Sequence, residues 1–397
     1  MEERFEALAE LAVHGANVQQ GQVLAITATI GQEQLVRAIA AVAYKLGALF
    51  VDPFFFDPYV KRARIQHANH ETLEFVPPWY GARINALGER GAARIGFAGV
   101  VAPDALAGLD GGRLGRDQLP WVSESAAVIN DRSTNWCAVP CPHPEWAKLV
   151  YPELAEDEAY ERLWSELWHV LRLDESDPIA AWDTRITALN ASAETLNAAQ
   201  LDAIEFSGPG TELTVGLLAS STWLAGDFET RDGLRHLPNV PTEEVFTAPD
   251  PERVDGHVTS TRPLVLKDGT IVRGLRVRFE GGRAVEIDAD ENGDAIRSRA
   301  AVDEGAARLG EVALVDRQGR IGPLGTVFYD TLLDENAASH IALGNAYSFN
   351  VEEADRGRLN TSAIHLDFMI GSNEVEVTGL TGGGGRVALL RGGDWQT

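Results

Sequence analysis

The chain has 397 residues, of which 45% are hydrophobic, and it carries a formal net charge of −25. This length is about two to three times that of an ordinary domain, so we expect two domains, residues 1–198 and residues 199–397. The negative charge excludes nucleic acid and anionic membranes as partners, because a phosphate surface would repel the protein.

The expected cellular location follows from two kinds of segment that the sequence does not contain. No apolar stretch reaches the ~18–20 residues that are needed to span a bilayer, and the acidic, amphipathic start is not a signal peptide. We therefore expect a cytoplasmic protein. Its two cysteines, Cys137 and Cys141, are too few for a disulfide scaffold and are interpreted as free thiols.

The N-terminal half has an α/β pattern. Residues 23–30 form a short apolar run that is typical of a buried strand, residues 35–46 have helical spacing, and a second strand begins at residue 48. These elements predict a β-α-β unit with parallel strands. Gly31 is a single glycine, so the pattern does not favour dinucleotide binding. A helix over residues 178–199, capped by Asp177, is expected to connect the two halves.

The C-terminal half has a different pattern. Residues 203–217 read as strand, turn and strand, and two more strands are expected around the glycine turn at 382–385. Residues 263–290 alternate between apolar and polar, with turns predicted at Asp268-Gly269 and Gly281-Gly282, which indicates an antiparallel meander.

The residues that can carry chemistry gather in this second half. His365 and Asp367 are two apart in an expected strand, so they would project from the same face. An imidazole beside a carboxylate suits a borderline cation such as zinc, cobalt or manganese. The alternative is a His–Asp hydrogen bond at the end of a sheet.

Three further acids and a histidine extend this pattern. Glu311 enters an apparently buried strand, where a bare carboxylate needs a metal ion or a salt bridge, for example to Arg308. Asp334 is expected to cap a helix that begins at Glu335 and contains His340. That helix aligns His340 with Tyr347, which is seven residues later. The simpler interpretation of this segment is an amphipathic helix with a charged cap.

A last pair of acids, Glu243 and Glu244, lies between a proline turn and an apolar strand. Carboxylate-rich, cysteine-free sets of this kind suit a hydrolase with two metal ions, in which a carboxylate bridges ions ~3.5–4 Å apart. The candidate ligands are Glu244, Glu311, His340, His365 and Asp367, and the further functional groups are Glu335 and Tyr347.

These motifs, together with others along nearly the whole chain, resemble the aminopeptidase T family of metallopeptidases, which includes AmpS and PepS. The matching segments include NVQQGQVLAITATI, GPGTELTVGL, NVPTEEVFTAPDP, RLGEVALV, YDTLLDENAASHIALGNAY and HLDFMIGS. The resemblance implies an α/β N-terminal domain, a C-terminal catalytic domain of the α+β class that is β-rich and barrel-like, and a homodimer. The spacing between His340 and His365 is shorter than in some relatives, which predicts a trimmed loop near the site.

Carried over by position, the resemblance makes Glu335 the catalytic glutamate and Tyr347 an active-site tyrosine. It selects Glu244 over Glu243 as a ligand, and it assigns the other ligands as above. The implied cofactor is a pair of divalent ions, Zn²⁺ or alternatively Co²⁺, Mn²⁺ or Mg²⁺. We therefore predict a metallo-aminopeptidase that acts on small peptides, with Glu335 as the general base. The alternatives are another metallohydrolase, such as an amidase or dipeptidase, and a non-enzymatic α/β binding protein.

Overall fold

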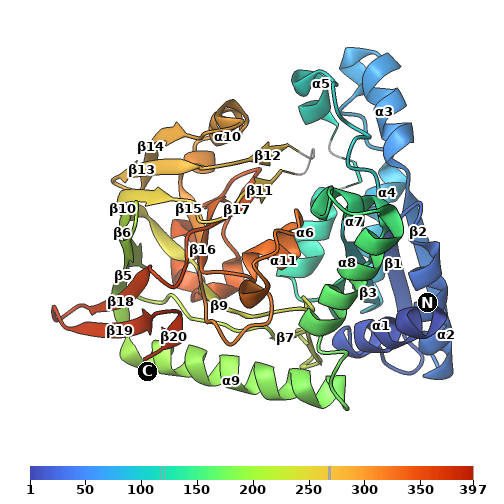
Figure 1. The fold of residues 1–397 in the computed structure, drawn as a ribbon, viewed down its shortest axis with the longest axis horizontal. Coiled ribbons are helices and arrows are strands. Elements are labelled where there is room, and N and C mark those ends of the chain that lie inside the picture. The colour runs from blue at the N-terminus through green and yellow to red at the C-terminus, as the bar shows by residue number, and fades with distance from the viewer. Residues whose placement is uncertain (118, 121, 267–269, 397) are drawn as a thin grey trace. The chain divides into compact units, whose positions relative to one another are not determined.

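A computed structural model describes residues 1–117, 119–120, 122–266 and 270–396, and Figure 1 traces them. By its internal contacts the chain forms two compact units. Unit 1 is Met1–Trp182 with Asp227–Pro241, and unit 2 is Asp183–Gly226 with Thr242–Thr397. The expected domains, 1–198 and 199–397, stay a prediction, because compact units need not fold separately.

Unit 1 is mainly helical, and its described residues also form a four-stranded and a two-stranded sheet. Its helices are α1 Glu2–Gly15, α2 Glu33–Lys45, α3 Pro58–His67, α4 Pro78–Glu89, α5 Gly111–Arg116, α6 Ser123–Asn130, α7 Pro144–Val150 and α8 Glu156–Val170. Its strands are β1 Val23–Thr29, β2 Phe50–Phe56, β3 Ala93–Ala98, β4 Trp136–Pro140, β7 Phe228–Glu229 and β8 Arg235–His236.

The four-stranded sheet of unit 1 has the order β2-β1-β3-β4, and all its pairings are parallel. Strands β7 and β8 form a separate antiparallel pair. The predicted β-α-β unit is confirmed, since α2 connects β1 to the parallel strand β2. Helix α4 packs through Ile84 and Leu87 against Val23 and Ala25 of β1. Strand β2 lies at one edge of the four-stranded sheet, so among the described residues one row of its backbone groups has no strand beside it.

Helix α9, Pro178–Ala199, is the segment in which the chain passes from unit 1 to unit 2 (Figure 1). The helix that was predicted over residues 178–199 is confirmed with the same bounds. Its predicted cap is confirmed as well, because the Asp177 carboxylate accepts a hydrogen bond from the backbone N–H of Ala180 at 3.0 Å.

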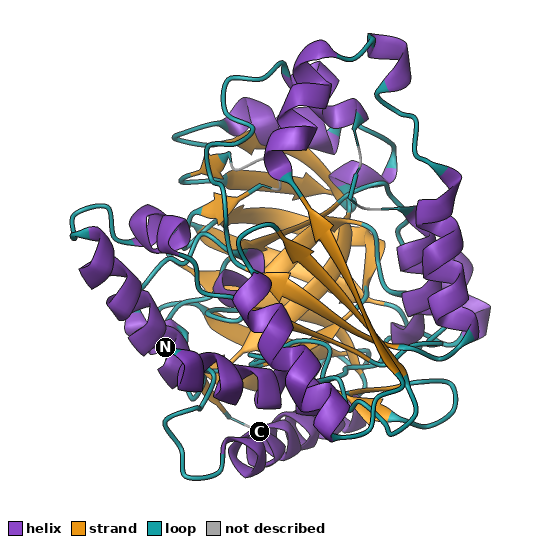
Figure 2. Ribbon diagram, turned by 90° about the vertical axis from the view of Figure 1, so that its right-hand side faces the viewer, coloured by secondary structure: helices purple, strands orange, loops and turns teal. Residues whose placement is uncertain are grey.

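Unit 2 is rich in strands, which are orange in Figure 2. They are β5 Leu201–Gly208, β6 Thr211–Leu217, β9 Glu244–Thr247, β10 Pro249–Thr259, β11 Leu264–Val265, β12 Ile271–Val272, β13 Arg276–Glu280, β14 Arg283–Asp288, β15 Leu309–Val315, β16 His340–Gly344, β17 His365–Met369, β18 Glu376–Thr381, β19 Arg386–Arg391 and β20 Asp394–Trp395. The helices are α10 Gly293–Ala300 and α11 Thr331–Glu335, and short 3-10 turns include Ser348–Asn350.

The strands of unit 2 form open sheets. An eight-stranded sheet has the order β14-β13-β10-β6-β5-β18-β19-β20, and a four-stranded sheet has the order β17-β16-β15-β9. The pairings that were predicted for residues 203–217 and for the C-terminal glycine turn are confirmed as β5–β6 and β18–β19. The class is therefore mixed α/β with several sheets. Among the sheets of the described residues none closes into a barrel, so the barrel-like expectation is not confirmed.

The predicted meander is present as two antiparallel hairpins, β11–β12 and β13–β14. The second hairpin turns at Gly281 and Gly282, which have φ values of 53° and 81°, a backbone conformation that glycine adopts without strain. The turn predicted at Asp268-Gly269 lies outside the described residues. Within the described part of the chain no helix has the length and apolar character for crossing a bilayer.

One predicted element is wrong. The expected helix from Glu335 through Tyr347 is instead the end of α11, a short connection and strand β16, which begins at His340. The HIALG run of β16 is completely buried between β15 and β17. Pairing on both sides supplies its backbone hydrogen bonds, which outweighs the helical spacing of its neighbours.

Candidate metal centre

The four-stranded sheet of unit 2 has one polar face and one apolar face. Directly opposed residues of antiparallel strands share a face, and Glu311 opposes Ala342, which in turn opposes Asp367. Every second residue along a strand lies on the same face, so the pairings assign the rest of this face. Its members are Glu244, Phe246, Glu311, Ala313, Val315, His340, Ala342, Gly344, His365, Asp367 and Met369. The other face consists mainly of core residues such as Leu314, Ile341 and Phe368.

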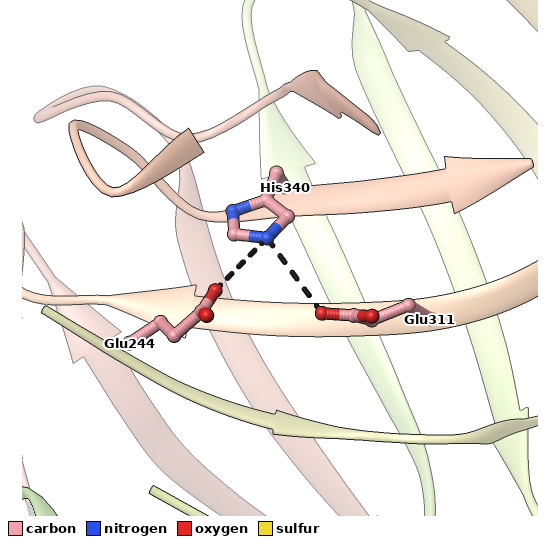
Figure 3. A group of neighbouring side chains, drawn as sticks. All are labelled: Glu244, Glu311 and His340. Carbon is pink, nitrogen blue, oxygen red and sulfur yellow. Dashed lines mark ion pairs between the residues drawn. The ribbon is translucent and has the colours of Figure 1, made fainter. Parts of the chain in front are cut away.

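The first group on this face joins three strands. Glu244 of β9, Glu311 of β15 and His340 of β16 point toward one another in Figure 3. The His340 Nε2 atom lies 3.0 Å from Glu244 Oε2 and 3.9 Å from Glu311 Oε1. One ligand atom from each of the three residues lies within 4.8 Å of the other two, which is compact enough to hold one ion.

The second group shares Glu311 with the first. The His365 Nε2 atom lies 3.2 Å from Asp367 Oδ1 and 3.5 Å from Glu311 Oε2. These three residues also offer ligand atoms within 4.8 Å of one another. Glu311 faces the first group with Oε1 and the second with Oε2, and its carboxylate is paired with these histidines rather than with Arg308, which binds the backbone oxygens of Pro251 and Gly281.

Both histidines are oriented by backbone oxygens. The Nδ1 atom of His365 lies 2.8 Å from the Asn345 oxygen, and that of His340 lies 3.2 Å from the Ala338 oxygen. Since a backbone oxygen only accepts, each Nδ1 carries a proton and donates it. Each Nε2 is therefore directed toward the carboxylates, which is the usual arrangement of a metal-binding histidine.

The charges of the cluster shift each other's protonation. Burial, reinforced by the charges of Glu244 and Asp367, raises the pKa of Glu311 to about 8. Burial alone lowers a histidine pKa, yet the adjacent Glu244 carboxylate raises that of His340 to about 9. Burial would likewise raise the pKa of Asp367, but the His365 imidazole holds it below its usual range. The site therefore holds protons that a bound cation would displace.

Glu335 and Tyr347 lie beside this cluster. Burial raises the pKa of Glu335 well above its usual range, and the charges of Asp367 and Glu244 raise it further. The Tyr347 ring contacts the His365 ring with centroids 5.8 Å apart, and it is packed between Phe246 and Phe349. Glu335 is the last residue of α11, which precedes β16 in the chain, and Tyr347 follows β16. The structure therefore brings together all seven residues that the sequence singled out.

The donor set fits a divalent cation. Glu244 Oε2 is buried, and its partner on this face is the Nε2 atom of His340 at 3.0 Å. Three buried carboxylates so close together are costly to ionise unless a cation binds them. Three carboxylates and two imidazoles, with no cysteine, are ligands that suit zinc, cobalt or manganese.

Sequence reasoning missed the residues that support this cluster. Glu243 is completely buried, and its carboxylate pairs with Arg185 of α9 rather than facing the cluster. Arg185 also binds Asp316, and the Asn336 side chain accepts a hydrogen bond from the Glu243 backbone N–H. The two adjacent glutamates were a signal, but nothing in the sequence connects them with an arginine 58 residues away.

Residues 1–395 match the family model described as thermophilic metalloprotease (M29). The chain belongs to this metalloprotease family. It is 43% identical to aminopeptidase T of Thermus aquaticus, over 99% of this chain and 98% of that protein. It is 36% identical to aminopeptidase PepS of Streptococcus thermophilus, again over 99% and 98% of the two chains.

A solved structure agrees with these matches. The wild-type AmpT from Thermus thermophilus superposes with a TM-score of 0.92 at 42% sequence identity, covering 100% of this chain and 99% of that one. The expected resemblance to the aminopeptidase T family is confirmed. The chain was expected to be an enzyme that hydrolyses peptide bonds, and its membership of a metalloprotease family confirms this. Membership of this family also implies the use of divalent metal.

Proposed function

We propose that the protein is an exo-aminopeptidase that removes the N-terminal residue of small peptides, with two divalent ions in the cluster and Glu335 as the general base. The observation that supports it is the shared carboxylate of Glu311, which has one oxygen toward each ligand group. Aminopeptidase is also the printed name of relatives that match along the whole chain.

The ligands divide between two places in this proposal. Glu244 and His340 would hold one ion, His365 and Asp367 would hold the other, and Glu311, which belongs to both ligand groups, would serve both. A bridging carboxylate is typical of two-metal hydrolases. Divalent ions bound here would lower the pKa of a water molecule and polarise the scissile carbonyl group. The cluster tolerates zinc, cobalt and manganese, so the ligand set alone does not select one of them.

The remaining residues of the site act on the substrate. Glu335 takes a proton from the attacking water and returns it to the leaving amine. Tyr347 donates a hydrogen bond to the oxygen that becomes negative in the transition state, a contribution of about 3 kcal/mol when well placed. The carboxylates of the cluster attract the positively charged α-amino group of an unblocked peptide, which confines cleavage to the first peptide bond.

The test is turnover of leucine p-nitroanilide by purified protein, as isolated, after chelation, and after zinc or cobalt is added back. We expect activity to disappear on chelation and to return with metal. Unblocked and N-acetylated forms of the same di- and tripeptides then test the exo-specificity. Hydrolysis of the acetylated peptides at equal rates, or no turnover with any metal on any unblocked peptide, would refute the aminopeptidase assignment.

A further inference from the structure

A hydrogen bond connects the chain neighbours of Glu335 and Glu244. Asn336 follows Glu335 in the chain, and Glu243 precedes Glu244. The Asn336 Oδ1 atom accepts the Glu243 backbone N–H at 2.6 Å, and neither Asn336 nor Glu243 is exposed at all. Because each partner is one residue from a functional side chain, this bond fixes the separation of the backbone segments that carry Glu335 and Glu244.

The Glu243 end of this bond is held rigidly. Its carboxylate accepts a hydrogen bond from Arg185 Nε at 2.5 Å, and the guanidinium of Arg185 also binds both oxygens of Asp316, at 2.9 Å and 3.2 Å. Each of the three side chains is at least nine-tenths buried. Buried, charge-assisted hydrogen bonds with matched partners are strong and directional, so the segment before Glu244 cannot drift.

The Glu335 end is held on both sides. Asn336 donates through Nδ2 to the Leu332 oxygen at 2.9 Å, so its amide is fixed at both ends. On the other side of Glu335, the buried Asp334 carboxylate accepts the backbone N–H groups of Phe328 and Asp330, at 2.9 Å and 3.1 Å. Glu335 therefore lies in the chain between two residues whose side chains are each anchored to backbone groups.

We propose that Asn336, anchored through Glu243 to Arg185, is a positioning residue that holds the proposed base Glu335 at a fixed distance from the proposed metal ligand Glu244. This inference rests on the proposed function. It assigns no chemistry to Asn336 itself. Removing its side chain should loosen Glu244, which weakens metal binding, and should displace Glu335, which lowers turnover even when metal is saturating.

The experiment compares the full-length wild type with Asn336→Ala. The zinc dissociation constant is measured by competition with a colorimetric chelator, and kcat and KM are measured at saturating zinc. We expect a loss of zinc affinity of about 10- to 100-fold, as for other outer-shell partners of metal ligands. We expect a fall in kcat of up to about 100-fold, because a misplacement of about 1 Å has that effect, with KM changed less than about threefold.

The matched control is Asn135→Ala in unit 1. Asn135 is also a buried bridging amide, which donates to the Ala16 oxygen and accepts from Gln22. We expect this variant to lose stability, with zinc affinity and kcat within about threefold of wild type. Asn135 belongs to unit 1, whereas the candidate ligands and Asn336 belong to unit 2, and sites that share no partners act independently. If both variants lose zinc affinity and kcat alike, or if Asn336→Ala retains both, the inference is wrong.

Two further outcomes are informative. If Asn336→Ala does not fold, Asn336→Ser takes its place, because a serine side chain is too short to reach both the Glu243 N–H and the Leu332 oxygen. Unchanged zinc affinity and kcat in this variant overturn the inference. If the wild type binds zinc but hydrolyses no unblocked peptide, the proposed function fails alone, and the zinc affinities of wild type and Asn336→Ala still decide the role of Asn336. If the wild type binds no zinc, both fail.

Discussion

Glu335 differs from the other carboxylates of the cluster in its position in the chain. The ligand candidates project from strands, whereas Glu335 ends the short helix α11. Its neighbours Asp334 and Asn336 are both engaged with backbone groups of unit 2. A carboxylate held beside the ligand groups, and belonging to neither of them, is suited to move a proton rather than to bind an ion.

We therefore predict that Glu335→Gln retains bound metal and loses nearly all turnover. Glutamine has the same shape but cannot accept the proton of the attacking water, so the loss should lie in kcat by about 10²–10⁴-fold. The measurement is metal content by elemental analysis together with kcat on leucine p-nitroanilide. A variant with near-normal kcat would show that another group is the base.

Tyr347 should contribute less. Tyr347→Phe keeps the ring that packs against His365 and Phe349 and removes only the hydroxyl. If the hydroxyl donates to the developing oxyanion, kcat falls by about 10²-fold with little change in KM and metal content. An unchanged kcat would show that the Tyr347 hydroxyl does not donate to the oxyanion and that the residue contributes only packing.

His236 in unit 1 provides a pH prediction that is independent of the metal centre. Burial lowers the pKa of His236 to about 4, and its Nε2 atom has no hydrogen-bond partner among the described residues. The unfolded chain, with a pKa near 6.5, binds this proton more tightly. Protonation of His236 therefore does not lower the free energy of unfolding above about pH 6.5. As the pH falls from 6.5 toward 4, it lowers that free energy by about 3 kcal/mol in all.

The variant His236→Phe should remove this pH dependence. A phenyl ring keeps the edge contacts with Phe228 and Trp136, and it has no nitrogen to protonate. Urea unfolding at several pH values between 7 and 4 would show the wild type losing stability faster than the variant. Parallel pH curves for the two proteins would contradict the burial of a neutral histidine.

At the scale of elements, strand patterns were enough to predict three of the seven residues of the candidate site. The two-residue spacing of His365 and Asp367 predicts a common face, and the register of β17 places both on the polar face of the sheet. The apolar run after Glu311 predicts a buried strand, which is β15. Both predictions depend only on local pattern, and local pattern is what a single sequence contains.

The helix predicted after Glu335 fails for the opposite reason. The segment has helical spacing in isolation, but β16 is formed by its pairing with β15 and β17, which lie on either side of it in the chain. The same limit applies to Arg185 and Asp316, which are 131 residues apart. Contacts of that kind are set by the tertiary fold, and spacing along one sequence does not reveal them.

The stability of the protein should depend strongly on one charged residue of helix α9, Arg185. Arg185→Met leaves the buried carboxylates of Glu243 and Asp316 without their shared cation, which should cost about 3–5 kcal/mol in the free energy of unfolding. Asp177→Ala on the same helix removes only a cap and should cost about 1 kcal/mol. Urea denaturation of the two variants tests the difference, and equal losses would mean that the ion network contributes little.

At the scale of the whole molecule, the match to the family runs from end to end, so the co-linear series of motifs identified the class although the individual motifs were short. The oligomeric state has to be argued from the surface of the protein. Within unit 1, residues 30–79, which include the edge strand β2, contain several exposed apolar side chains, among them Tyr44, Leu49, Phe50, Tyr59 and Trp79. Surfaces of this kind commonly mark protein–protein contacts.

We propose that a second copy of the chain covers this surface, in line with the homodimer that the resemblance implies. Light scattering of the purified protein should give twice the chain mass of 42.9 kDa. The variant Phe50→Glu places a charge on the edge strand, where Phe50 is 55% exposed, and should shift the mass to that of one chain. A wild type that already has the mass of a single chain would refute this assembly.

The candidate ligands are distributed over four strands of one sheet, from Glu244 to Asp367. No short stretch of the chain can assemble them, so the unfolded protein has almost no affinity for the ions that the folded one would hold. Occupancy is then coupled to folding, and each site at 100-fold excess of metal over its dissociation constant would add about 2.7 kcal/mol of stability. In a cell short of metal, the empty enzyme would unfold more often and be degraded faster. Its abundance, and not only its activity, would follow the metal supply.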